Sequence, residues 1–269
     1  NLIVEGTKGS AENIVWTIND IVLYLTHGKN ILISSLGGSG KSSTLSMIED
    51  HLISSFNDIE YIPIKIKLRN YSRNTLKQRI NDELNINNGS WRSLPFKFIF
   101  LFDALDEMLQ HDTQAFIDEL ATITEGYNFI LTIRNTGLNI ETVIPSLDYC
   151  ISIKPLSYRS AFQIAEKTFQ DKELKKFYDE YRNRLSSIGF NFLSLPFVLS
   201  LSIEYYKNNK NIPDRIENIL EEWIQSKIKN DSKKVRDTNN KVNKIPIKYI
   251  EQVFSLLLYK SKIEKNFFS

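Results

Sequence analysis

A glycine-rich turn between two apolar segments carries the residues with the clearest chemistry. Residues 35–42 read SLGGSGKS and match the phosphate-binding pattern G-x-x-x-x-G-K-[ST], except that Ser35 stands at the first glycine position. An apolar run at 30–34 precedes the turn and helical spacing follows at 42–54, which predicts strand, loop and helix. In such a turn, backbone N–H groups surround phosphate oxygens at a helix N-terminus, whose dipole favours anions. The sequence therefore predicts a phosphate site.

The residues of this turn have distinct expected roles. Lys41 would reach the β- and γ-phosphates of a nucleotide, and the Ser42 hydroxyl would ligate Mg²⁺. The alternative is a glycine-rich turn that carries a lysine without binding a nucleotide. The residues of the turn expected to bind ATP or ADP are Gly37, Gly38, Ser39, Gly40, Lys41, Ser42 and Ser43.

A second chemically competent group is acidic and follows the most apolar segment. Residues 98–107 read FIFLFDALDE, and the first five are all apolar, as is typical of a strand covered on both faces. An acid at the carboxyl end of such a strand faces the crevice in which α/β sheets bind ligands, so Asp103 is expected to hold Mg²⁺. Asp106 or Glu107 could orient or deprotonate the attacking water, and the residues alone do not decide which. Alternatively, these two acids are the acidic start of the following helix.

Composition limits the class of protein. The chain has 269 residues, 42% hydrophobic and 25% charged, with a formal net charge of +2. These values are typical of globular domains and exclude a protein that coats nucleic acid or an anionic membrane through bulk charge. The single cysteine, Cys150, cannot form an internal disulfide, so a reducing compartment, the cytoplasm, is expected. No apolar run approaches the roughly 18 residues of a membrane span, no signal peptide opens the chain, and the first residue, Asn1, indicates a segment of a longer protein.

Strand and helix patterns alternate over about the first 155 residues. This alternation predicts an α/β fold with a parallel sheet and right-handed crossovers. Ser10 is the expected N-cap of the first helix. Strands are predicted at 30–34, 59–68, 98–102, 128–133 and 149–153, and helices at 11–27, 42–54, 75–84 and 113–125.

The pattern changes after Pro155, where no further strand is predicted. A polar segment at 230–244, rich in Lys and Asn, is predicted to be a loop or linker. The amphipathic segments that are predicted to be helical are 158–188, 196–209, 213–230 and 247–261.

Together, the two motifs resemble the NACHT branch of the signal-transduction P-loop NTPases, the STAND class, which includes animal innate-immune receptors and bacterial antiphage proteins. The resemblance extends from about Gly28 to Trp223. It departs at Ser35, at Ala104, where many relatives have Gly, and at Asn135, where relatives commonly have Pro. Three further segments are similar to family motifs: YIPIKIKLR at 61–69 to the second strand, FILTIR at 129–134 to the sensor-1 strand, and LSLPF at 193–197 to a helical-domain segment.

This resemblance implies a fold and two more site residues. The fold would be that of a P-loop NTPase with a five-stranded parallel sheet in the order 5-1-4-3-2, followed by an α-helical domain. Arg134 would be a catalytic sensor residue, and Pro196 would lie against the adenine. The alternatives are a surface arginine at a strand end and a proline that merely begins a helix. The implied domains are a nucleotide-binding domain at 1–155, a helical domain at 156–230, a flexible linker at 231–246 and the start of a winged-helix domain at 247–269.

The implied function is a slowly hydrolysing ATPase that works as a molecular switch in a larger receptor. ATP or ADP and Mg²⁺ would be the cofactors, and ATP would drive self-association of the NTPase module, as in bacterial antiphage defence. Effector and sensor domains would lie outside this segment, the trigger would be a molecule such as a phage protein, and neither a membrane nor directly bound nucleic acid is expected. Two other hypotheses stay open: a turnover P-loop ATPase acting on nucleic acid or protein, and a nucleotide-binding scaffold without hydrolysis.

Overall fold

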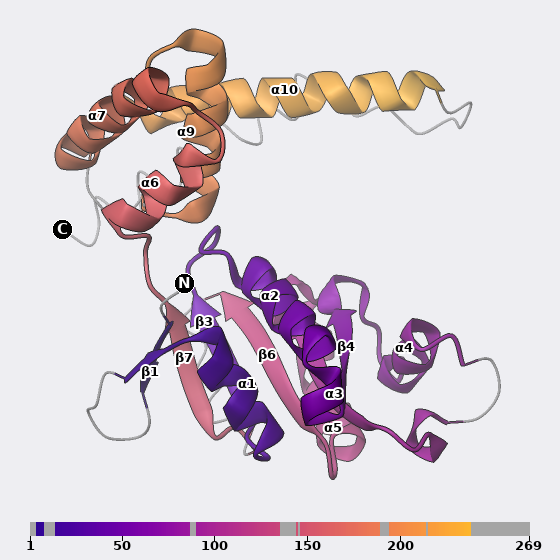
Figure 1. The fold of residues 1–269 in the computed structure, drawn as a ribbon. Helices are drawn as coiled ribbons and strands as arrows, with labels where there is room; N and C mark the ends of the chain where they lie inside the picture. Colours follow the sequence, from indigo (N-terminus) through magenta and orange to yellow (C-terminus); the bar gives the residue numbers. More distant parts are fainter. Residues whose placement is uncertain are drawn as a thin grey trace, which may run out of the picture. The chain divides into compact units, whose positions relative to one another are not determined.

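The chain divides into two compact units, residues 1–203 and 204–269. The first unit contains a seven-stranded sheet, the helices that cover it and the following helices as far as the middle of α9 (Pro196–Asn209), most of them labelled in Figure 1. Because the division falls inside α9, the domain limits at 155 and 230 remain predictions. The computed structural model describes residues 4–7, 14–86, 90–134, 144, 146–188, 194–213 and 215–237.

The sheet has a parallel body and an antiparallel edge. Strands β3 to β7 are parallel to their neighbours within this group, whereas β1 runs antiparallel to both β2 and β7. The spatial order is β2-β1-β7-β3-β6-β5-β4. In chain order the strands are β1 (Val4–Thr7), β2 (Ile14–Trp16), β3 (Ile31–Ser35), β4 (Tyr61–Lys67), β5 (Lys97–Asp103), β6 (Asn128–Arg134) and β7 (Tyr149–Ile153).

The parallel body lies where the sequence predicts five strands. Counted in chain order from β3, these strands lie as fifth, first, fourth, third and second. The predicted five-stranded sheet is too small, because β1 and β2 extend it at the β7 edge. The helix predicted at 11–27 is also wrong in its first half. There β2 precedes α1 (Ile18–Thr26), which is capped by Thr17 rather than Ser10, because Thr17 and Asp20 form a capping box.

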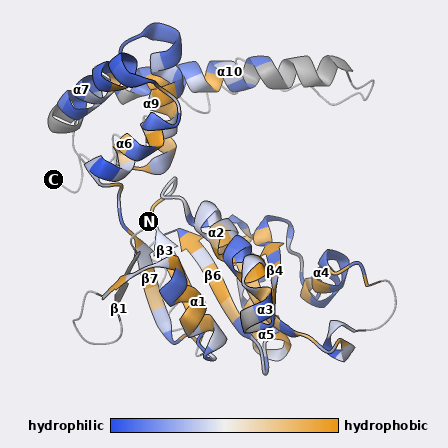
Figure 2. Cartoon of the chain, viewed as in Figure 1, coloured by the Kyte–Doolittle hydropathy of each residue, from blue (hydrophilic) through white to orange (hydrophobic). Residues whose placement is uncertain are grey.

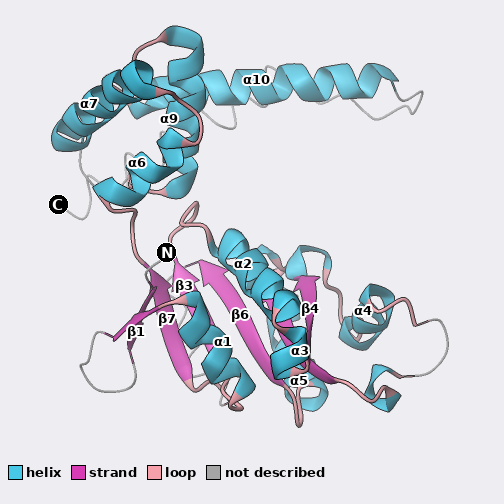
Figure 3. Ribbon diagram, viewed as in Figure 1, coloured by secondary structure: helices cyan, strands magenta, loops and turns pink. Residues whose placement is uncertain are grey.

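Helices cover both faces of this sheet. One buried apolar cluster joins α1 and α2 to one face, and a second cluster joins α4 and α5 to the other. Figure 3 shows the strands together with these helices, and in Figure 2 apolar residues concentrate on the strands. The remaining helices of this part are α2 (Lys41–Ser54), α3 (Phe56–Ile59), α4 (Leu76–Glu83) and α5 (Thr113–Ile123).

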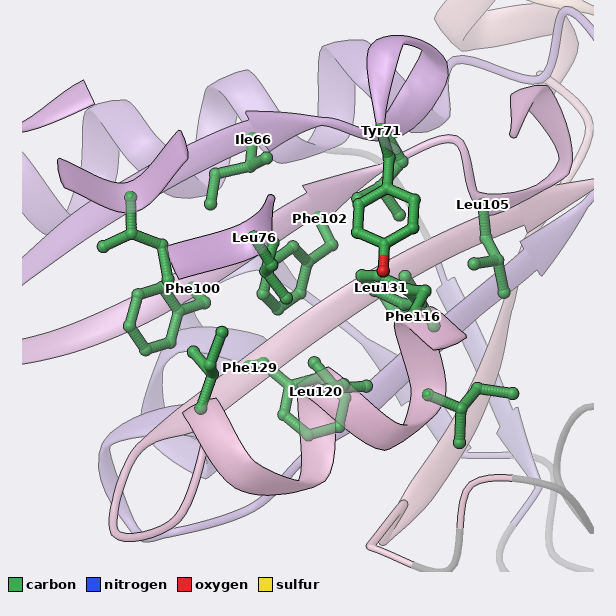
Figure 4. Packing of buried hydrophobic residues seen from close by; sticks show 14 of the residues in the cluster. Ile66, Tyr71, Leu76, Phe100, Phe102, Leu105, Phe116, Leu120, Phe129 and Leu131 are labelled. Atoms are coloured by element: carbon green, nitrogen blue, oxygen red, sulfur yellow. The ribbon is translucent and has the colours of Figure 1, made fainter. Parts of the chain in front are cut away.

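Strand β5 shows why the layers form. Phe98, Phe100 and Phe102 belong to the cluster on one face, while Ile99 and Leu101 belong to the cluster on the other, because successive side chains of a strand alternate. All five are buried. In Figure 4 the rings of Phe100 and Phe102 lie among side chains of α4, α5 and β6. A strand buried on both faces needs apolar residues at every position, as the sequence predicts.

Helices follow the last strand, as the sequence predicts. The segment predicted to be helical at 158–188 is interrupted, because Phe169 is buried between two helices and packs on Phe177, with ring centroids 5.1 Å apart. No helix of the described ranges has the length and apolarity needed to cross a membrane. Besides α9, the helices described here are α6 (Tyr158–Glu166), α7 (Asp171–Ile188) and α10 (Ile216–Asp237).

The linker predicted at 231–246 is wrong in its first part, since α10 continues to Asp237. Lys and Arg have high helix propensity, so a polar segment rich in them can continue a helix. The rest of that segment and the winged-helix start predicted at 247–269 lie outside the described residues.

Candidate functional site

Three segments that carry chemistry meet at one edge of the sheet. Because β3, β5 and β6 are parallel, their carboxyl ends lie at the same edge, and the residues that follow them converge there. We call residues 35–43 the phosphate loop, and the side chains of Asp103, Asp106, Glu107 and Arg134 the acid edge. Both border a cavity of about 370 Å³. It is lined by Gly37, Gly38, Gly40, Lys41, Ser42, Ser43, Asp103, Ala104, Asp106, Glu107, Arg134, Pro196, Phe197 and Ser200.

The phosphate loop has a backbone that favours glycine at two positions. Gly38 has φ +75° and Gly40 has φ +97°, both in the left-handed region that side chains with a Cβ rarely adopt. A Cβ at Gly38 would also lie only 3.0 Å from the Cβ of Phe197. Gly40 is the N-cap residue of α2, so the loop lies at a helix terminus whose first N–H groups have no acceptor within the helix.

Ser35, the departure from the phosphate-binding pattern, has a structural role of its own. It ends β3 without a positive φ, so glycine is not needed there. Its buried hydroxyl oxygen accepts a hydrogen bond from Ile153 N at 2.7 Å and thereby ties the start of the loop to β7. The substitution is therefore compatible with the loop.

Lys41 is the first residue of α2, and its side chain folds back over the phosphate loop. Its Nζ donates to Ser35 O at 2.8 Å and to Leu36 O at 2.9 Å. The pKa of the Lys41 ammonium lies below its ordinary value, mainly because the group is partly buried. Asp106 raises this pKa and Arg134 lowers it, both by smaller amounts. The ammonium thus lies within the loop, where it can pair with the charge of a phosphate.

Asp103 is the most buried residue of the acid edge, with 6% of its surface exposed. Its Oδ1 accepts hydrogen bonds from Ser42 Oγ at 3.1 Å and from Thr132 Oγ1 at 2.9 Å. Thr132 Oγ1 accepts in turn from Ala104 N at 2.8 Å, which fixes the end of β5 to β6. Ser42 and Asp103, the two predicted metal ligands, therefore present oxygen atoms side by side, and oxygen is the ligand that Mg²⁺ prefers.

Arg134 contacts both remaining acids. Its backbone N donates to Asp106 Oδ1 at 2.8 Å, its Nε pairs with Asp106 Oδ2 at 3.0 Å, and its Nη2 donates to Glu107 Oε1 at 3.3 Å. The two acids lie in a 3₁₀ turn at Leu105–Glu107, whereas α5 begins at Thr113, so they are not the first turn of that helix. The predicted catalytic residues thus form one connected group.

The N-terminus of α9 contacts the phosphate loop. Phe197 N donates to Gly38 O at 3.3 Å, and a Cβ at Gly40 would lie 3.7 Å from Pro196 Cγ. Pro196 is the first residue of α9, which agrees with the alternative that it merely begins a helix, but it also lines the cavity. Its predicted contact with an adenine remains a prediction.

The residues present fit a nucleotide with its metal ion. Ser39 Oγ is buried in the loop and has no hydrogen-bond partner in the described part of the chain, as expected of a group that waits for a ligand oxygen. The glycines leave room for phosphate beside Lys41. No group of three or more His, Cys, Asp and Glu side chains in the described ranges is arranged so that it could hold a metal ion by itself. Mg²⁺ suits the pair Ser42 and Asp103, since it usually completes its shell with waters and substrate phosphates.

Two contributors were not predicted from the sequence. Thr132 holds Asp103 and Ala104 together, and Phe197 rests on Gly38. Thr132 is a polar residue in the apolar segment FILTIR, which resembles the sensor-1 strand, but a threonine there is also an ordinary strand former, and its two hydrogen bonds could not be predicted. Phe197 lies in the family-like segment LSLPF, but the sequence does not indicate its contact with Gly38, because that contact joins two distant segments.

Comparison with known proteins finds similar structures but no matching sequence family. Models of protein families do not match this sequence, and no curated protein matches it either. The structure is similar to the Orc1 protein of Aeropyrum pernix in complex with DNA, with a TM-score of 0.51 and 13% identity over 76% of this chain and 64% of that one. Two others are PCH-2 of C. elegans (TM-score 0.49, 15% identity, 76% of this chain and 67% of that one) and the RuvB Holliday junction branch migration motor of Thermotoga maritima (0.42, 9%, 76% and 66%).

The likeness to Orc1 supports a P-loop NTPase fold for this chain. At this level of identity the likeness extends to the fold alone, and the match covers less than two thirds of the Orc1 chain.

Proposed function

We propose that the chain is an ATP-binding, slowly hydrolysing P-loop NTPase module that works as a molecular switch. The observation that carries this proposal is the contact between the phosphate loop and the buried acid: Ser42 Oγ lies 3.1 Å from Asp103 Oδ1, beside the glycine cradle and Lys41. ATP hydrolysis in P-loop proteins needs a cradle for the phosphates, a cation, a metal site and an acid that activates water. Residues suited to each of these four tasks line the cavity.

The residues divide these tasks among them. The backbone of the phosphate loop and Lys41 would hold the β- and γ-phosphates, while Ser42 and Asp103 would hold Mg²⁺, which neutralises charge on the phosphates when bound. An acid-edge carboxylate accepts a proton from the attacking water as its oxygen bonds to the γ-phosphorus. The bond to the bridging oxygen breaks, and ADP and phosphate leave. Arg134 would offset the negative charge near this centre.

The contact of α9 with the phosphate loop supports a switch. Phe197 N and Gly38 O share a hydrogen bond, so a nucleotide that alters the loop also alters the packing of α9. Such a difference in contacts between nucleotide states is what shifts a conformational equilibrium. We therefore expect the ATP-bound and ADP-bound forms to differ in the position of α9.

We assign this switch to a NACHT-type STAND receptor of bacterial antiphage defence, in which ATP drives self-association. The order of five similar motifs along the chain supports the assignment, and effector and sensor domains would be other parts of the same polypeptide. The cytoplasm is the expected location.

Calorimetry with ATP and ADP, a phosphate-release assay and sedimentation velocity together test the proposal. We expect Mg²⁺-dependent binding of both nucleotides, slow hydrolysis, and association that is greater with ATP than with ADP. Absence of ATP binding would contradict the site itself.

The same assays separate the two rival functions. The Orc1 protein was seen in complex with DNA, so DNA is one ligand to add. Rapid hydrolysis that DNA or a protein stimulates would favour a turnover ATPase. Tight binding without any hydrolysis would favour a scaffold.

A further inference from the structure

The chain turns back sharply after Asp103 and presents two acids to β6. Ala104 has φ +64°, a left-handed conformation that is costly for a residue with a Cβ. Leu105, next in the chain, is buried and anchors the turn in the core. Asp106 and Glu107 are thereby held beside the end of β6, although neither of them belongs to a strand.

These two acids differ in how Arg134 engages them. Asp106 uses both carboxylate oxygens: Oδ1 accepts from the Arg134 backbone N at 2.8 Å, and Oδ2 pairs with Nε at 3.0 Å. Its side chain is only 10% exposed. Glu107 uses one oxygen, Oε1, at the longer distance of 3.3 Å from Nη2, and its side chain is 37% exposed. Both carboxylate oxygens of Asp106 are therefore paired with Arg134, whereas Oε2 of Glu107 takes no part in the contact with Arg134.

The side chain of Arg134 lies against the phosphate loop. A Cβ at Gly37 would lie 3.9 Å from Arg134 Cδ and 4.0 Å from its Nε, so the side chain crosses directly over the loop. The Arg134 side chain is 55% exposed, and its guanidinium pairs with both acids. A long side chain with so much exposure loses considerable rotamer entropy when fixed, and two bonds to one carboxylate offset that loss.

We infer that Asp106 is a positioning residue that fixes Arg134 over the phosphate loop, and that Glu107 is the general base; this inference rests on the proposed function. As a base, Asp106 would have to release a bond to Arg134 before taking a proton. Glu107 borders the cavity with its exposed carboxylate and can accept the proton without moving Arg134.

The first test needs no hydrolysis. Arginine Nε–H resonances of the nucleotide-free chain are recorded by NMR, and the Arg134 signal is assigned with Arg134→Lys. We expect a shifted, slowly exchanging signal in the wild type that is lost in Asp106→Asn and retained in Glu107→Gln. The matched control, Asp118→Asn, changes an exposed acid on α5 and should leave the signal in place. A signal unaffected by Asp106→Asn would overturn the inference.

The second test is a double-mutant cycle on single-turnover hydrolysis, with folding checked by circular dichroism. Asp106→Asn and Arg134→Ala should each slow the reaction by about a hundredfold, the order of loss expected from a misplaced group. The double variant should be no slower than Arg134→Ala alone, because Asp106 acts through Arg134. Glu107→Gln should multiply the defect in either background. If Asp106→Asn does not fold, Asp106→Glu replaces it in the cycle and in the NMR experiment, because it keeps the charge but displaces both carboxylate oxygens from Arg134.

Failure of the inference and failure of the proposed function look different. Independent, multiplying losses for Asp106→Asn and Arg134→Ala in an active enzyme would overturn only the positioning role. A wild-type chain that binds no ATP would contradict the function, while the NMR result would still report whether Asp106 fixes Arg134.

Discussion

The phosphate loop and the acid edge face one cavity but are built in opposite ways. Within the phosphate loop, contacts join close neighbours, as between Lys41 Nζ and the carbonyl of Ser35 six positions earlier. In the acid edge, contacts join residues that are distant in the sequence, as between Asp106 in the turn after β5 and Arg134 at the end of β6, 28 positions apart. The loop offers mainly backbone groups and one cation, whereas the acid edge offers side chains. We therefore expect the loop to determine binding and the acid edge to determine turnover.

The largest effect should come from the loop. Lys41→Ala is expected to reduce ATP affinity below detection, because it removes the only side-chain cation of the phosphate loop and leaves phosphate charge unpaired. The fold should survive, since Lys41 serves the ligand more than the core. Isothermal titration calorimetry and a thermal melt provide the measurements.

A matched control separates this effect from a general loss of charge. Lys77→Ala removes an exposed lysine from α4 and should leave ATP affinity unchanged. A folded Lys41→Ala variant with wild-type affinity would show that the cavity is not the ATP site.

The next largest effect should come from the acid edge, and on rate alone. Glu107→Gln is expected to lower the hydrolysis rate by about 10² to 10⁴-fold, the usual contribution of a general base, while ATP affinity stays close to that of the wild type. The amide keeps the shape and the acceptor oxygen near Arg134 but cannot take a proton. Single-turnover phosphate release and calorimetry on the same preparation measure both quantities.

In a switch, this variant should also associate more readily with ATP, because the ATP-bound state persists. An unchanged hydrolysis rate in Glu107→Gln would show that Glu107 is not the general base. Equal loss of binding and turnover would remove the distinction between loop and acid edge.

The same contrast explains how much of the site could be predicted from the sequence. The loop was predictable because its pattern, residues 35–42, lies within one turn and a neighbouring strand and helix. The acid-edge residues were predictable as types, since acids that follow a buried strand reach the ligand edge. Their pairing was not, because it depends on the register between the turn after β5 and the end of β6.

The fold divides in a similar way. The strands β3 to β7 have enough apolar residues for their positions to be read from the pattern, most clearly at β5, which is buried on both faces. The short strand β2 was missed because the spacing of Ile14, Val15 and Ile18 also suits a helix. Its true identity comes from pairing with β1, a contact that no local pattern reports.

A smaller effect is expected at Thr132, which connects the acid edge to β6. Thr132→Val keeps the shape but removes the hydroxyl that donates to Asp103 and accepts from Ala104 N. A buried group left without its partner costs about 1–3 kcal/mol. We expect a loss of that size in the free energy of unfolding, measured in urea, together with weaker Mg²⁺-dependent ATP binding. Thr132→Ser retains the hydroxyl and should recover most of both, and a Val variant as stable as wild type would deny Thr132 this role.

The smallest expected effect compares two glycines and tests whether α9 rests on the phosphate loop. Gly38→Ala and Gly126→Ala both place a Cβ on a backbone of nearly equal positive φ, +75° and +77°, so both bear the same strain. Gly126 has no atom within 4 Å of that Cβ, whereas at Gly38 the Cβ of Phe197 is 3.0 Å away.

Gly38→Ala should therefore lower the free energy of unfolding by about 1 kcal/mol more than Gly126→Ala, the lower range for an overpacked contact. Urea denaturation of both variants measures this difference. Adding Phe197→Gly to both variants should abolish it, because the Cβ that lies 3.0 Å from the new methyl group is then absent. An equal loss at both glycines would mean that α9 does not press on the loop, and the contact proposed to couple nucleotide state to α9 would have to be sought at Pro196 instead.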